Sequence, residues 1–280
     1  MCYLVLETAF GEIRMKIAIR NFLVGSFLTA ASPLLAAPVG NPAAPKIITE
    51  GFFFSPSVWA DLRLGYEGDF VSDAKMEQQV ESSGRVDGYS QSTNSGTVTL
   101  NILNRLDLFG VFGSSKVQAD WRFSDGDALF RIEMETHYDF LWAAGARAVL
   151  FEWGKTSLGL GARYSASNYT PTWLTTNGAS SPVSGSHFEW KQWQVNLGLS
   201  YNIDLFTPYI GGKYSSEKAH LSSFPTPIAG NDSGSNHFKN RQPVGLYLGC
   251  SLSTGKLFML NVEGRLIDEE AVTISGDFRF

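Results

Sequence analysis

The feature that most constrains this chain is a period-two alternation of apolar and polar residues that recurs along most of its length. Between residues 58 and 66 the apolar side chains take every even position, and Asp61, Arg63 and Glu67 fall on the other phase. The same period runs through residues 192–201. Successive side chains of a strand point to opposite faces, so this pattern predicts strands with one apolar and one polar face.

The repetition of the pattern indicates a barrel rather than an isolated sheet. Beyond residue 40 there is no run of about 18 apolar residues, so a mature chain that crosses a membrane must do so with closed strands. We expect an all-β fold, a transmembrane antiparallel β-barrel of the outer membrane with about 12 strands, 10 to 16 being compatible with the pattern. Further alternating or weaker runs lie at residues 78–89, 98–108, 116–123, 130–135, 140–152, 158–164, 209–217, 244–252, 258–266 and 272–280.

The connections between these runs fall into two kinds. If the C-terminus lies in the periplasm, the long polar segments 168–186 and 219–241 both fall on the outer side. The short turns at 154–155, 204–205 and 254–256 all fall on the periplasmic side. Short periplasmic turns and longer outer loops are typical of outer-membrane barrels, and a soluble β-sandwich need not sort its loops in this way.

The two ends of the chain both predict export. Residues 1–36 are interpreted as an N-terminal extension and signal peptide, cleaved after Ala36, with residues 37–280 forming the barrel. Lys16 and Arg20 precede an apolar stretch from 22 to 35, as in a secretory signal. We expect translation to start at Met15, since the acidic residues before it are foreign to a signal peptide. The last strand resembles the signal that barrel assembly machinery recognises, which consists of Val272, Ile274, Gly276, Phe278 and Phe280.

Aromatic residues gather near the predicted strand ends, where amphipathic rings favour the headgroup region of a bilayer. Taken singly, each of them is equally compatible with packing in a core. The residues concerned are Trp142, Trp153, Tyr164, Trp173, Trp190, Trp193, Tyr201, Tyr209 and Tyr247.

After the predicted cleavage point the sequence Pro38-Val39-Gly40-Asn41-Pro42-Ala43-Ala44-Pro45 resembles the mature N-terminus of chlamydial major outer membrane proteins. Four further stretches resemble that family in order, at residues 63–71, 142–150, 206–211 and 278–280. The resemblance implies a weakly selective porin for small hydrophilic solutes and ions that is also a structural component of the cell envelope. It implies outer-membrane lipid as a partner and leaves a homotrimer open. Residues 151–155 lie where the family has paired cysteines, so the disulfide-linked envelope role is not implied.

The polar phase supplies the candidate lining of a pore. Its mixed charges can keep a channel wet, or they can pair across a narrow, closed lumen. A non-conducting structural or adhesin barrel therefore stays open as the alternative. The candidates are Asp61, Arg63, Glu67, Arg131, Glu133, Glu135, Arg163, Lys213, Glu217, Glu263 and Arg265.

Other chemistry finds little support. A net charge of −5 leaves no basic stripe for nucleic acid. Two cysteines are too few for a zinc site, and we expect no catalytic, cofactor or metal site. An outer-membrane barrel hydrolase is a less favoured alternative, because no Gly-x-Ser-x-Gly elbow occurs.

The four histidines, His137, His187, His220 and His237, are read as solvated loop residues. Gly159 and Gly161 lie within an alternating run, which makes them small lumen-side residues rather than a phosphate loop.

Overall fold

The structure, a computed structural model, describes residues 38–51, 59–79, 85–125, 128–223 and 237–280. The predicted extension and signal peptide, residues 1–36, lie outside the described residues. Within them no helix is both long and apolar enough to span a membrane.

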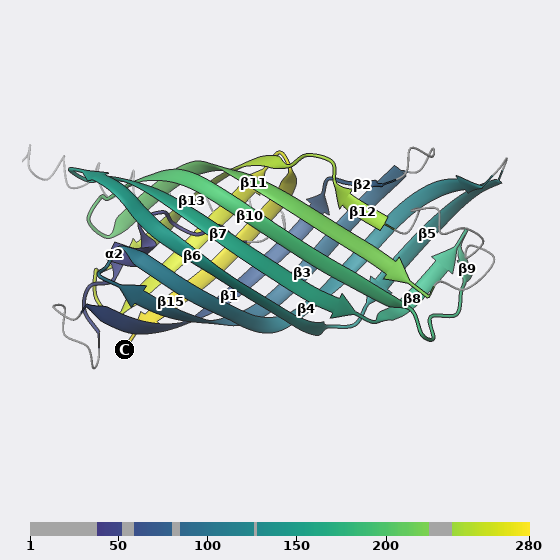
Figure 1. Cartoon of the computed structure of the whole chain (residues 1–280), viewed down its shortest axis with the longest axis horizontal. Helices are drawn as coiled ribbons and strands as arrows, with labels where there is room; N and C mark the ends of the chain where they lie inside the picture. The colour runs from purple at the N-terminus through teal and green to yellow at the C-terminus, as the bar shows by residue number, and fades with distance from the viewer. Residues whose placement is uncertain (1–37, 52–58, 80–84, 126–127, 224–236) are drawn as a thin grey trace, which may run out of the picture. The chain divides into compact units, whose positions relative to one another are not determined.

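Ten antiparallel strands of the described chain close into a barrel, because β3 pairs with β4 at one side and β1 pairs with β15 at the other (Figure 1). The predicted all-β barrel is confirmed, with ten strands in the ring. The ring strands are β1 (Ala60–Ala74), β3 (Arg85–Ile102), β4 (Leu106–Asp125), β6 (Asp139–Trp153), β7 (Thr156–Tyr169), β10 (His187–Tyr201), β11 (Phe206–Ser222), β13 (Val244–Ser253), β14 (Phe258–Leu266) and β15 (Glu269–Arg279).

Five shorter strands extend the wall at the end of the barrel away from the C-terminus (Figure 1). They pair with the ends of β4 and β11 and with one another. They are β2 (Met76–Gln78), β5 (Ala128–Thr136), β8 (Pro171–Thr176), β9 (Ala179–Ser180) and β12 (His237–Asn240). The expected count of about 12 differs from ten because residues 116–123 are the second half of the long β4 and residues 130–135 belong to β5, outside the ring.

Tight turns join the ring strands at the end where the chain terminates (Figure 1). Gly154, Asp204 and Gly255 adopt left-handed backbone conformations in three of these turns, with φ of 61°, 50° and 77°. Glycine and, less readily, Asp tolerate this region, which allows a tight turn between two strands without a long loop. The sorting of short turns to one end agrees with the prediction.

The barrel wall has a lipid-facing apolar band. In β10 the side chains alternate between exposed and buried along the whole strand, so that Leu197 is 49% exposed while Gln194 is 1% exposed. The apolar stretch from Trp193 to Tyr201 matches the roughly 9 to 11 residues with which a tilted strand crosses a bilayer. Leu197 therefore contacts lipid in the membrane, which explains why an apolar side chain is exposed on the outside of the barrel.

An aromatic girdle borders the band on its outer side. Phe112, Trp142, Tyr164, Trp193 and Tyr214 lie on five neighbouring strands, β4, β6, β7, β10 and β11, and are exposed. The ring centroids of Trp142 and Tyr164 are 5.6 Å apart, and those of Trp193 and Tyr214 are 5.5 Å apart. Such rings are typical of the membrane interface.

The sequence-based expectation of girdle positions was wrong for three aromatic residues. Trp190, Tyr209 and Tyr247 are buried inside the barrel, at 3%, 4% and 0% exposed. Each lies on the polar phase of its strand and contributes a ring to the interior. Proximity to a strand end therefore does not by itself indicate a lipid-facing position.

Candidate functional site

The interior of the barrel is lined by charged side chains from seven of the ten ring strands. Of the predicted lining residues, eight are buried at 7% exposure or less on the inner face. Buried charges are costly unless they are paired or hydrated, so their partners decide what the lumen can do. The eight are Asp61, Arg63, Glu67, Arg163, Lys213, Glu217, Glu263 and Arg265.

The other three predicted residues, Arg131, Glu133 and Glu135, lie on β5 beyond the membrane band. The guanidinium of Arg131 donates to Asp120 at 3.2 and 2.5 Å, and its side chain is 51% exposed. The structure does not bring these three together with the interior charges. Ile132 and Met134, on the other phase of the strand, are the buried residues here.

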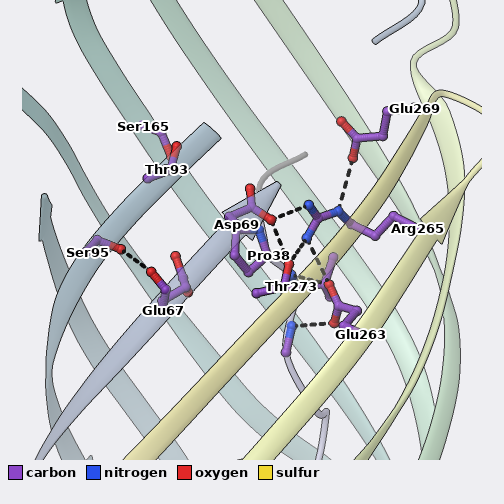
Figure 2. A network of polar contacts seen from close by, with 12 residues as sticks. Pro38, Glu67, Asp69, Thr93, Ser95, Ser165, Glu263, Arg265, Glu269 and Thr273 are labelled. Atoms are coloured by element: carbon purple, nitrogen blue, oxygen red, sulfur yellow. Dashed lines mark hydrogen bonds and ion pairs between the residues drawn. The ribbon is translucent and has the colours of Figure 1, made fainter. Parts of the chain in front are cut away.

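Arg265 is the centre of one interior network (Figure 2). Its guanidinium contacts Asp69 (Nη2 to Oδ1, 2.7 Å), Glu263 (Nη1 to Oε1, 3.2 Å) and Glu269 (Nε to Oε1, 3.4 Å). It also donates to Thr273 Oγ1 at 2.6 Å, and that hydroxyl donates to Asp69 at 2.7 Å. One fully buried cation thus compensates three carboxylates from β1, β14 and β15.

The neighbouring Lys213 of β11 adds a second cation to this side of the lumen. Its ammonium lies 3.0 Å from Asp268 Oδ2 and also contacts Glu269. Glu217, four residues further along β11 on the same face, accepts a hydrogen bond from the indole of Trp190. Acidic groups outnumber cations on this wall.

Near the turn end of the barrel, Arg63 and Arg279 share Asp61. Arg63 Nε lies 3.1 Å from Asp61 Oδ1 and Arg279 Nη2 lies 3.1 Å from Asp61 Oδ2. Asp107 follows on β4 and accepts from Arg147 Nη2 at 3.0 Å. Arg63 Nη1 also lies 3.9 Å from Asp107 Oδ1, so these ion pairs form one connected network. We call it the ionic rim, and it consists of Asp61, Arg63, Asp107, Arg147 and Arg279.

Arg163 and Glu67 face one another across the lumen from β7 and β1. Both guanidinium Nη atoms of Arg163 lie within 3.0 to 3.2 Å of the Glu67 carboxylate. Together with Arg147 and Asp277 they line a cavity of about 40 Å³. Pro38, Val39, Gly40 and Asn41 also line it, and with these residues in place the cavity holds a few water molecules and is too small for an organic solute.

Residues 38–48 lie inside the barrel, in the half of the lumen nearer the tight turns, which we call the inner half. Val39, Ala44 and Ile48 are 7%, 0% and 0% exposed, and the short helix α2 (Ala44–Ile47) lies inside the turn end of the barrel (Figure 1). Ala43, Ala44, Ile47 and Ile48 cluster with Met259 of β14, and Val39 clusters with Tyr209 and Tyr247. The interior rings of Tyr209 and Tyr247 thus pack against this segment.

The other half of the lumen, farther from the tight turns and called the outer half, is filled by an apolar cluster. Trp121, Tyr169 and Phe188 are 0%, 0% and 1% exposed and belong to one cluster of buried side chains. Phe238 of β12 packs edge-on against Trp121 with ring centroids 5.2 Å apart. The described interior is therefore polar and partly hydrated toward the turn end and apolar toward the other.

Sequence reasoning missed several interior charges. Asp69 lies on the same phase of β1 as Glu67, so the alternation itself could have identified it. Arg147 on β6 and Asp107 on β4 share their inward phases mainly with small or apolar residues, so the alternation does not single them out. Asp268 and Glu269 lie at the β14–β15 turn, where no alternation exists to assign a face. Gly159 and Gly161 do face inward and are buried.

The histidines are dispersed over the outer extensions. His137 and His187 are exposed, and His220 and His237 stack across β11 and β12 with centroids 3.9 Å apart. Groups of three or more His, Cys, Asp or Glu arranged to hold a metal do not occur among the described residues. The absence of an enzymatic site stays a prediction.

The sequence is similar to chlamydial porins over nearly all of its length. It is 27% identical to the major outer membrane porin, serovar F, of Chlamydia trachomatis, covering 95% of this chain and all of the relative. The serovar H protein is 26% identical with the same coverage. The alignments, 395 and 397 positions long, exceed the 280 residues of this chain, so the relatives carry insertions that it lacks.

No family model matches the sequence. Among solved structures, an outer membrane channel from Pseudomonas putida F1 matches with a TM-score of 0.42 and 10% identity, over 88% of this chain and all of the other. The outer membrane protease OmpT from Escherichia coli matches with a TM-score of 0.36 and 11% identity, over 79% and 93%. The closed antiparallel wall, its lipid-facing band and the similarity to the chlamydial proteins identify the chain as an outer-membrane β-barrel that is similar in sequence to major outer membrane porins.

Proposed function

We propose that the chain is a member of the major outer membrane porin family. It provides a path for small hydrophilic solutes and ions past the charged side chains that line its lumen. The observation that carries this proposal is the set of eight buried charged side chains on the inner face of a wall whose outer face is apolar. A purely structural barrel gains little from burying ionised groups, because each buried ion pair costs desolvation that an apolar interior avoids. A conducting lumen needs such groups to keep water in place.

The Arg163–Glu67 pair is the expected selectivity element. It spans the lumen between β7 and β1, and ions that pass it experience both charges at low effective dielectric. Changing Arg163→Gln leaves Glu67 without that cation. We expect the reversal potential in a salt gradient across a planar bilayer to shift toward cation preference.

Arg131→Gln is the matched control, since Arg131 lies on an exposed face of β5. It should leave the reversal potential unchanged. An equal shift in the two variants would contradict a lumen role for Arg163. Absence of any conductance from folded parent protein would contradict the porin function itself.

A second candidate is a non-conducting structural barrel of the envelope. It is favoured by the occupation of the lumen, since residues 38–48 fill the inner half and the cluster around Trp121 and Phe238 fills the outer half. Single-channel recording separates the two candidates. Steady non-conductance with intact heat-modifiable folding would favour the structural role.

We also propose that the last strand directs assembly and that the lipid face can support association of barrels. Ile274 and Phe278 of β15 are exposed on the lipid side, at 45% and 48%, beside the exposed Leu64 of β1. Both the assembly machinery and a homotrimer are partners for which this apolar seam is available. Crosslinking in native envelopes tests the trimer.

A further inference from the structure

We propose that the inner half of the lumen is a binding site for the chain's own residues 38–48, and that this segment is a removable plug of the channel. The ligand is an extended, proline-rich peptide, and the site recognises its backbone. The gating role rests on the proposed porin function. The existence of the site does not, and it can be tested separately.

Glu263 recognises the start of the segment. Its two carboxylate oxygens accept hydrogen bonds from consecutive backbone amides, Val39 N at 2.9 Å and Gly40 N at 2.8 Å. Tyr209 also donates to this carboxylate, at 3.0 Å. Gln194 donates to the carbonyl of Pro38 at 3.0 Å. Charge-assisted bonds to two successive amides fix the direction and register of the bound backbone.

Cations of the ionic rim, together with the amide of Asn101, recognise the end of the segment. Arg63 donates to the carbonyls of Ala44 at 3.0 Å and Pro45 at 2.9 Å. Asn101 donates to Pro45 O at 2.9 Å, and Arg279 donates to Ile48 O at 2.8 Å. The carbonyls that a single helical turn leaves unpaired are thus satisfied by the barrel wall.

The middle of the segment sits in a notch made by two glycines. Gly159 of β7 and Gly198 of β10 are direct partners across the two strands, and Pro42 lies against both. A Cβ on Gly159 would lie 2.5 Å from the carbonyl oxygen of Pro42. One on Gly198 would lie 2.8 Å from Pro42 Cγ and closer still to the hydroxyl of Tyr247, a ring that packs against the segment. The wall therefore has no room for a side chain where the segment passes. This complementarity indicates a fitted site rather than incidental filling.

The segment itself is suited to docking. Pro38, Pro42 and Pro45 lack an amide hydrogen and restrict the free chain, which lowers both the number of donors to satisfy and the entropy lost on binding. Gly40 has a φ of 77°, and a Cβ there would lie 2.4 Å from Arg147 Nη1. Lys46, the one charged residue of the segment, pairs with Glu152 at 3.1 Å.

The barrel does not need the segment for its own closure. Backbone-to-backbone hydrogen bonds of residues 38–48 in the described chain stay within the segment, and the ten ring strands pair without it. Its contacts with the wall are hydrogen bonds that involve at least one side chain, including the Lys46–Glu152 ion pair, and small apolar surfaces. Water can replace the former when the segment leaves, so release does not break the ladder.

Gly159→Ala tests the site, with Gly161→Ala as its matched control. Both glycines face inward on β7, but the three atoms nearest to a Cβ on Gly161 all belong to the flexible side chain of Asn196. The probe is a lumen thiol, Ser251→Cys, in a chain with Cys2 and Cys250 changed to Ser. Ser251 is 1% exposed and bonds to Asn41 at 3.0 Å, so the docked segment covers it.

A small water-soluble methanethiosulfonate should modify Cys at position 251 on the order of tenfold faster in Gly159→Ala than in Gly161→Ala. Glu263→Gln should act in the same direction, since an amide NH₂ would face a backbone N–H. Each variant is first shown to be folded by heat-modifiability. Equal rates in folded Gly159→Ala and Gly161→Ala would overturn the proposal.

Oxidative crosslinking gives a second measurement. Asn41→Cys with Ser251→Cys should form a disulfide, whereas Asn41→Cys with Leu252→Cys should not, because Leu252 is the adjacent residue on the lipid face. Failure of the first pair to crosslink would count against the docked segment.

Conductance then separates the plug from the pore. A higher open fraction in Gly159→Ala than in Gly161→Ala supports both proposals. Altered thiol protection without conductance in any variant retains the plug and overturns the porin function. Stable and equal conductance in the two variants, with equal thiol protection, retains the pore and overturns the plug.

Discussion

Arg265→Gln is expected to lower the free energy of unfolding by about 3 to 5 kcal/mol, the range for removing one partner of a buried ionic network. Arg265 is fully buried and compensates Asp69, Glu263 and Glu269. Without it three carboxylates face one another in the lumen. Urea titration of the refolded barrel, followed by the loss of the compact form on cold electrophoresis, measures the change.

Two companion variants give this prediction its control. Arg131→Gln removes an exposed arginine of similar pairing and should change the unfolding curve little. Combining Arg265→Gln with Asp69→Asn should recover part of the loss, since the two groups interact directly. A loss for Arg265→Gln no larger than that of Arg131→Gln would show that the interior is hydrated enough to dispense with pairing.

Leu197→Arg is expected to destabilise the folded barrel by about 2 to 4 kcal/mol, the range for a cation at the bilayer midplane on a barrel's lipid face. Leu197 lies in the middle of the lipid-facing stretch of β10, between Val195 and Leu199, and all three point outward. The arginine would have to reach a headgroup across the apolar band. The fraction of heat-modifiable folded protein in liposomes as a function of urea measures the effect.

Leu205→Arg is the control for position. Leu205 lies in the β10–β11 turn and is 58% exposed, outside the apolar band of β10. At the interface the same substitution should cost only about 0 to 1 kcal/mol. Equal losses at positions 197 and 205 would contradict the placement of the band.

Alternation of residue type was sufficient to predict the barrel because the bilayer makes period two unambiguous. In β10 every even-numbered residue from 188 to 200 is buried and every odd-numbered residue is exposed, as the sequence pattern indicates. Short turns with glycine then located one end of the ring. The number of strands was harder to predict, since β4 is 20 residues long and its second half continues beyond the membrane band, where the pattern weakens.

The same pattern has the opposite meaning outside the membrane. In β5 the apolar residues Ile132 and Met134 face inward and the charged Arg131 faces water. Inside the band, lipid takes the apolar face and the lumen takes the polar one. Beyond it the solvent outside is water, so the apolar face turns to the interior. Periodicity alone cannot tell which regime a strand is in.

The occupant of the lumen could not be predicted from the sequence. Residues 38–48 show no alternation, and their resemblance to a family's N-terminus says nothing about where they lie. The notch that holds Pro42 needs Gly159 and Gly198 in register across two strands. That register depends on the length of the connection between β7 and β10, which local sequence does not encode.

The covalent link between the segment and β1 sets how strongly the plug must bind. Residues 49–59 tether it to the first ring strand, and a short linker keeps a ligand at an effective concentration in the millimolar range. At about 1 mM, an intrinsic dissociation constant of about 0.1 mM leaves the site about nine-tenths filled. The contacts in the lumen can therefore be individually weak and exchange quickly, and occupancy is independent of how much protein the membrane contains.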